Sequence, residues 1–122
     1  MDLLPRLNEL ALKRGLHPME KDMLPELGYV GHDDQGKPVF LFMYQTDSSL
    51  CFIENLISDP ESDPHQRAIV IAKLFDHAAS EAKQLGAKYL MARTENNNLI
   101  PKLIDKNFVQ SSDKTRLFIR GL

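Results

Sequence analysis

The chain has 122 residues, 43% of them hydrophobic, which is enough for one domain to bury a continuous core without metal ions or disulfides. Its 15 basic and 17 acidic residues give a formal net charge of -2, which excludes a strongly basic surface for nucleic acid or an anionic membrane. The single cysteine, an N-terminus unlike a secretory signal, and the lack of any apolar run near the roughly 20 residues that cross a bilayer all favour a soluble, cytoplasmic protein.

The first half of the chain predicts a helix followed by an antiparallel meander. Leucines at helical spacing begin at Leu3, and Gly15 follows a basic pair where a helix end is expected. Three strand candidates follow at residues 27–32, 38–45 and 49–57. The segments DDQGK and TDS between them are rich in turn residues, as in hairpins.

The second half begins with the longest predicted helix, from about Pro64 to Leu85. Asp63, Pro64 and Gln66 match an N-cap, a first-turn proline and the amide of a capping box. An apolar stripe on this helix predicts packing against a sheet, and it comprises Leu74, Phe75, Ala79, Ala82 and Leu85.

A strand at 87–94, a short helix within 96–108 and a final hairpin at 109–122 complete the predicted order. A strand, the long helix and the next strand form a crossover that pairs parallel strands, so the sheet is expected to be mixed. The fold class is α+β, in a single domain spanning residues 1–122.

The phrases IENLISDPE, AASEAKQLGAKYL and NNNLIPKLIDKNF, in this order and spacing, resemble the GNAT superfamily of acyl-coenzyme A dependent N-acyltransferases over about Leu50 to Leu122. The resemblance implies a GNAT-like domain with a mixed, mainly antiparallel sheet flanked by helices. It also implies transfer of acetyl from acetyl-CoA to an amine of a small molecule or a protein. A monomer and a homodimer both remain open.

The resemblance also implies the site residues. Glu54 would be the general base, and the backbone amides of Leu56 and Ile57 would meet the pantetheine arm. Gln66 and Arg67 would lie near the phosphates, and Asn96 near the pantetheine. Other interpretations remain open: Glu54 as a solvent-facing strand position, Leu56 and Ile57 in ordinary sheet pairing, and Asn96 as a helix N-cap.

Several positions depart from the family pattern. Ile69 and Ile71 occupy the places of two glycines that let backbone amides approach a pyrophosphate. Asp63 can bond those amides itself, and Leu103 replaces the tyrosine that commonly serves as general acid. Asn107 can adopt the positive-φ turn of the family's glycine. The alternative hypothesis is therefore a catalytically silent GNAT-like binding or structural module.

Neither a metal site nor a thiol nucleophile is expected. The four histidines share no zinc-like spacing, and Cys51 lies in an apolar run typical of the core.

Overall fold

A computed structural model describes residues 3–93, 98–112 and 117–122, and its main feature is a six-stranded sheet with strand order β1-β2-β3-β4-β6-β5. Only β3 and β4 pair in parallel among these strands. The predicted α+β class with a mixed, mainly antiparallel sheet is confirmed. The strands are β1 (Gly28–His32), β2 (Pro38–Gln45), β3 (Leu50–Ser58), β4 (Tyr89–Arg93), β5 (Val109–Ser112) and β6 (Leu117–Gly121).

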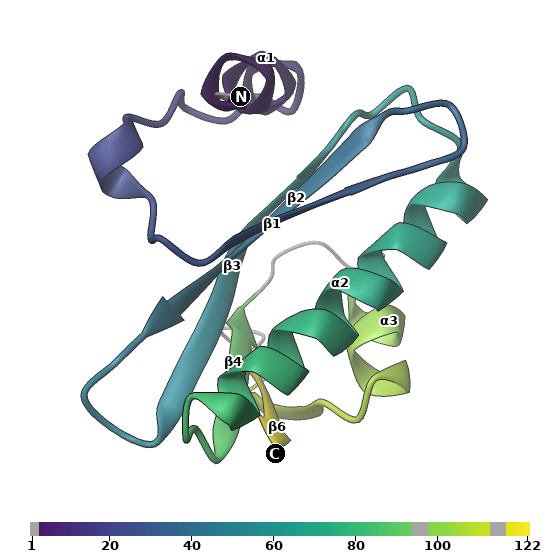
Figure 1. Ribbon diagram of the computed structural model, residues 1–122. Coiled ribbons are helices and arrows are strands. Elements are labelled where there is room, and N and C mark those ends of the chain that lie inside the picture. The colour runs from purple at the N-terminus through teal and green to yellow at the C-terminus, as the bar shows by residue number, and fades with distance from the viewer. Residues whose placement is uncertain (1–2, 94–97, 113–116) are drawn as a thin grey trace.

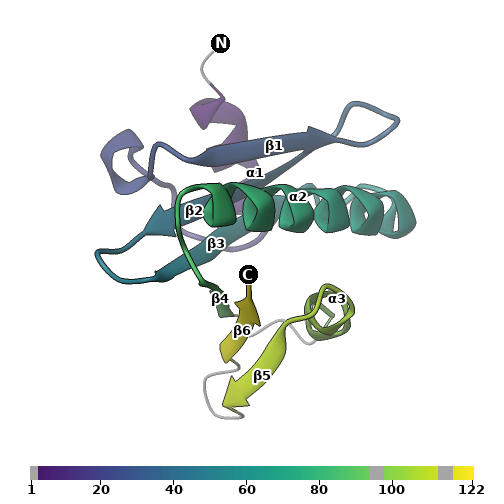
Figure 2. The same cartoon turned by 60° about the horizontal axis from the view of Figure 1, so that its bottom comes forward.

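Helices cover both faces of the sheet. Helix α1 (Leu4–Lys13) and a short 3-10 helix, η1 (Lys21–Met23), lie on one side, whereas α2 (Pro64–Gln84) and α3 (Ile100–Asp105) lie on the other (Figure 1). A second view shows β4, β6 and β5 turned away from β1, β2 and β3, as expected of a twisted sheet (Figure 2). We refer to the two sides as the α1 face and the α2 face.

Alternation along β2 divides the core between these faces. Val39, Leu41 and Met43 belong to the cluster under α2, whereas Phe40 and Phe42 belong to the cluster under α1. Because successive side chains of a strand point to opposite faces, one continuous apolar run supplies both clusters.

Helix α2 begins as predicted, with Asp63 as N-cap and Pro64 in the first turn. The second half of the predicted capping box is wrong, because the Gln66 side chain bonds Asp34 in the β1-β2 turn. The predicted stripe is buried at four of its positions, but Leu85 is 50% exposed because the helix has already ended there.

A bulge interrupts β3 at Asn55. Phe40 pairs with Ile57 and Phe42 pairs with Glu54, so two residues of β3 face the single residue Leu41. Asn55 has φ of 58°, a left-handed conformation that asparagine tolerates better than most residues. The extra residue shifts the alternation, and Ile57 therefore packs under α1 instead of α2.

Candidate active site

The two parallel strands separate at the centre of the sheet. The β3-β4 ladder ends at Ile53 and Ala92, yet β3 continues to Ser58 (Figure 1). Beyond this point lies a cavity of about 800 Å³, which we call the splay cavity, with walls from β3, β4, α2, the α3 region and the end of α1. Leu56 and Ile57 line it in the part of β3 that β4 no longer pairs.

The charged lining of the splay cavity is mainly basic. Four cationic side chains line it, and Glu54 is the one acidic side chain among its described residues. A concave surface with low-dielectric walls and mostly one sign of charge concentrates ions of the opposite sign. The cavity is therefore suited to an anionic ligand, and its cations are Arg14, Arg67, Arg93 and Lys102.

Two of these cations lie beside each other where β3 leads into α2. Arg14, just after α1, donates from Nε to the Ser58 carbonyl over 3.0 Å and from Nη2 to Ser58 Oγ over 2.7 Å. Arg67 donates from Nε to Ser62 Oγ over 3.0 Å and from Nη2 to the Ser62 carbonyl over 2.9 Å. Burial, and then repulsion by Arg67, lower the pKa of Arg14, and the Asp59 carboxylate partly offsets them. Because the two guanidinium groups repel each other, a further anion bound near both would be stabilised.

The acidic residues of the same loop are turned away from this role. Asp59 is 3% exposed, and its carboxylate lies 3.6 Å from Arg6 and 3.9 Å from Lys13 of α1. A hydrogen bond from the Glu61 amide and then these cations lower the pKa of Asp59. Asp63 accepts the Gln66 amide over 2.9 Å, which leaves fewer helix amides for a ligand.

Glu54 lies on the α1 face of β3, opposite Phe42. The neighbouring Asn55 amide donates to the Tyr44 hydroxyl over 2.9 Å, and the Tyr44 ring stacks on Phe52. Burial and then the Glu54 charge raise the pKa of Tyr44, although the bond from Asn55 opposes this. A carboxylate, a hydroxyl and an aromatic surface thus lie together beside the splay.

The structure brings most of the predicted site residues to one place. Glu54, Leu56, Ile57 and Arg67 all line the splay cavity, whereas Gln66 is not among its lining residues. Asn96 lies outside the described residues.

The residues that depart from the family pattern differ in burial and backbone conformation. Ile71 is 4% exposed and Ile69 is 46% exposed. Leu103 is fully buried where the family's tyrosine is expected. Asn107 has the predicted positive φ, at 69°.

Sequence reasoning missed Arg14, Arg93 and Lys102. Arg14 precedes a helix-ending glycine, where a basic residue is ordinary, and it reaches Ser58 across 44 positions of sequence. No local pattern distinguishes these three residues from the other basic residues of the chain.

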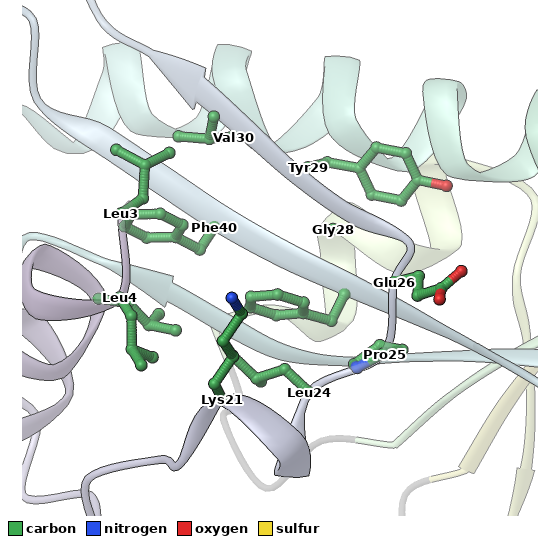
Figure 3. Close-up of a pocket in the computed structure, with 12 residues that line it drawn as sticks. Leu3, Leu4, Lys21, Leu24, Pro25, Glu26, Gly28, Tyr29, Val30 and Phe40 are labelled. Carbon is green, nitrogen blue, oxygen red and sulfur yellow. The ribbon is translucent and has the colours of Figure 1, made fainter. Parts of the chain in front are cut away.

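A second cavity, of about 450 Å³, lies on the α1 face between α1, η1 and β1. Its walls are mostly apolar, including Leu3, Leu24 and Phe40, with Lys21 and Glu26 as its charged residues (Figure 3). The two cavities share no lining residue among those described. This second cavity is thus separate from the candidate active site.

Over the described ranges, no group of three or more histidine, cysteine, aspartate or glutamate side chains could hold a metal ion. None of the described helices is long and apolar enough to cross a membrane. Cys51 is buried, and burial raises the pKa of its thiol, as expected of a core residue.

No family model and no curated protein matches the chain. Solved structures do. An acetyltransferase of the GNAT family from Staphylococcus aureus Mu50 has a TM-score of 0.69 at 10% identity, over 98% of this chain and 93% of that one. Rv2747 from Mycobacterium tuberculosis, in complex with CoA, has a TM-score of 0.67 at 14% identity, over 90% of this chain and 68% of that one.

N-acetylglutamate synthase from Neisseria gonorrhoeae, complexed with coenzyme A and L-arginine, has a TM-score of 0.58 at 13% identity. The match covers 98% of this chain but 31% of the synthase. At such identities the likeness concerns the fold alone, and this chain has the GNAT fold.

Proposed function

We propose that the protein is an acyl-CoA dependent N-acyltransferase that moves an acetyl group from acetyl-CoA to an amine. The cationic lining of the splay cavity carries this proposal, because acetyl-CoA bears three phosphates and Arg14, Arg67 and Lys102 of the cavity can meet them. Two of the solved structures with this fold were obtained with coenzyme A. The fold and the charge of the cavity thus support the same ligand.

Arg14 and Arg67 would hold the pyrophosphate. Their side chains are already fixed by bonds to Ser58 and Ser62, so little conformational entropy is lost when an anion binds. An anion between them would also relieve their mutual repulsion. In this chain, guanidinium groups would do what glycine-rich loop amides do in the family pattern.

The unpaired edge of β3 would hold the pantetheine arm through the backbone of Leu56 and Ile57, and Glu54 would accept the proton of the acceptor amine. The thioester of acetyl-CoA supplies an activated acetyl group. Because Glu54 faces α1, the amine would approach from the α1 face of the sheet.

The alternative is a catalytically silent GNAT-like module. Its support is that Asp63 bonds the Gln66 amide and that Leu103 replaces the acidic hydroxyl of a tyrosine. The two functions predict different responses to acetyl-CoA.

Calorimetric titration of acetyl-CoA tests the proposal. We expect binding, and at a hundred times the dissociation constant a ligand adds about 2.7 kcal/mol to the free energy of unfolding. Replacing Arg67 by Met should weaken binding roughly 10- to 100-fold, since a hydrogen bond to a charged group contributes about 1.5–3 kcal/mol. The matched control is Lys73→Met, at an exposed position of the same helix. A titration without heat, together with an unchanged melting temperature, would exclude the enzyme and favour the silent module.

A further inference from the structure

A half-exposed apolar row crosses three strands on the α1 face of the sheet. Tyr44 of β2 pairs with Phe52 of β3, and Phe52 pairs with Met91 of β4. All three side chains are half-buried. The Tyr44 and Phe52 rings are stacked at 5.0 Å, with their planes 4° apart. We call these three residues the aromatic row.

A charged row lies next to it, at the mouth of the splay cavity. Glu54 follows Phe52 by two residues and therefore shares its face. Arg93 follows Met91 by two residues and shares that face as well, and it comes directly after Ala92, the last residue paired with β3. Glu54 and Arg93 thus occupy equivalent places on the two strands where these begin to separate.

These two charges form no direct ion pair among the described residues. Both line the splay cavity. An anion and a cation kept apart at one cavity mouth match a ligand that carries both signs of charge. The adjacent aromatic row matches a planar apolar group.

We propose that the acceptor is a free α-amino acid with an aromatic side chain. Its amino group would meet Glu54, its carboxylate would meet Arg93, and its ring would lie on the aromatic row. This inference rests on the function proposed above and names the acceptor class of that same site.

The chemistry balances with the residues present. The α-ammonium group loses one proton to Glu54, which passes it to solvent. The free amine attacks the thioester carbonyl, so a C–N bond forms and the C–S bond breaks. The second proton of the nitrogen ends on the departing sulfur, so the products are the N-acetyl amino acid and the free thiol of CoA.

Arg93 is the specificity-determining residue in this scheme, because an arginine can bind a carboxylate through two parallel hydrogen bonds. Removing the carboxylate of the acceptor and removing the guanidinium group of Arg93 should therefore lower kcat/KM by about the same factor. A ring on Phe52 contributes less, since an aromatic pair is worth about 0.5–1.5 kcal/mol.

The test compares three acceptors with acetyl-CoA at saturation: L-phenylalanine, phenethylamine, which lacks the carboxylate, and L-alanine, which lacks the ring. Release of the CoA thiol and the mass of the product are measured. We expect kcat/KM for phenylalanine to exceed that for phenethylamine roughly 10- to 100-fold. Alanine should be poorer than phenylalanine by roughly 2- to 12-fold. Phenylalanine should also raise the melting temperature of the CoA-saturated protein.

Variants separate the roles. Arg93→Met should remove the advantage of phenylalanine over phenethylamine and leave the dissociation constant of acetyl-CoA within about 3-fold, a limit below the contribution of one charged hydrogen bond. Phe52→Leu should lower kcat/KM for phenylalanine more than for alanine. Lys88→Met, at an exposed position just before β4, is the matched control. It should change neither the preference for phenylalanine over phenethylamine nor the dissociation constant of acetyl-CoA.

Two results would overturn the acceptor class while leaving the acyl-CoA function in place. One is binding of acetyl-CoA without any effect of phenylalanine on the melting temperature or on thiol release. The other is an equal response of phenylalanine and phenethylamine to Arg93→Met. Failure of acetyl-CoA itself to bind would instead refute the proposed function, and the acceptor proposal with it.

Discussion

Asn55 determines which way the end of β3 faces, and its replacement gives a graded prediction. Its φ of 58° costs a residue with a Cβ about 1–2 kcal/mol, which asparagine partly avoids through local hydrogen bonding. Its side chain also donates to the Tyr44 hydroxyl over 2.9 Å, a bond worth about 1 kcal/mol. We therefore expect Asn55→Ala to lower the free energy of unfolding by about 2–3 kcal/mol.

Two further variants separate the effect of the backbone conformation at Asn55 from that of its hydrogen bond to Tyr44. Asn55→Gly keeps the left-handed conformation and should be about 1 kcal/mol less destabilising than the alanine variant. Tyr44→Phe keeps the stacked ring and should cost about 1 kcal/mol. If the bond is real, the double variant Tyr44→Phe with Asn55→Gly should show a coupling free energy of about 0.5–1.5 kcal/mol.

Urea denaturation followed by circular dichroism measures these values, and the slope of each transition reports whether the surface exposed on unfolding has changed. Calorimetry with acetyl-CoA on the folded variants adds a functional measurement. If Asn55→Ala were as stable as the wild type, or no more destabilising than Asn55→Gly, the bulge would not be held by this residue, and the reasoning would fail.

Three other predictions concern the loop and helix that follow β3. Asp63→Ala should cost about 1 kcal/mol by removing the N-cap, whereas Asp63→Asn should retain most of the stability in the same urea assay, because asparagine caps equally well. Ile69→Gly places a glycine where the family pattern has one, but it should lower the free energy of unfolding by about 1 kcal/mol, because position 69 lies inside α2 and is exposed. It should not tighten acetyl-CoA binding, and tighter binding would contradict a helix that begins at Pro64. Because the pKa of Asp59 is lowered in the folded state, its ionised carboxylate stabilises the fold fully above the unfolded-state pKa of about 4, and this stabilisation is lost as the pH falls below that value. Melting curves between about pH 3 and 7 should therefore show a smaller decrease of the melting temperature at low pH for Asp59→Asn than for the wild type.

Much of the fold could be predicted because its signals are local. The capped start of α2 and the apolar strands follow from residues within a few positions of one another, and the mixed sheet follows from the order of strand, long helix and strand. Leu85 illustrates the limit of such reasoning. It continues the helical spacing, but the helix ends one residue earlier, so the side chain has no sheet to pack against and stays half-exposed. The bulge at Asn55 is a second limit, since an extra strand residue leaves little trace in the apolar pattern.

The site was predictable only where a residue lies on the strand or helix that leads into it. Glu54 and Arg67 meet that condition, and both line the splay cavity. Gln66 lies beside Arg67 in sequence, but one step along a helix turns a side chain by about 100°, and Gln66 instead bonds Asp34. Arg14 and Arg93 come from distant segments, and only the three-dimensional packing brings them to the same cavity.

A chain without the two glycines of the family pattern can still bind an anion. A glycine-rich loop binds phosphate through backbone amides, and it needs both the amides and room for close approach. Here Asp63 takes an amide, and isoleucines fill the glycine positions, so that mode is closed. Guanidinium groups have no such requirement, because they reach the ligand on long side chains and carry full charges. Arg14 reaches this point from α1, while Arg6 and Lys13 of the same helix neutralise Asp59. Helix α1 and its C-cap thus supply a cation to the cavity and neutralise the carboxylate that would oppose an anion there, as the proposed function requires.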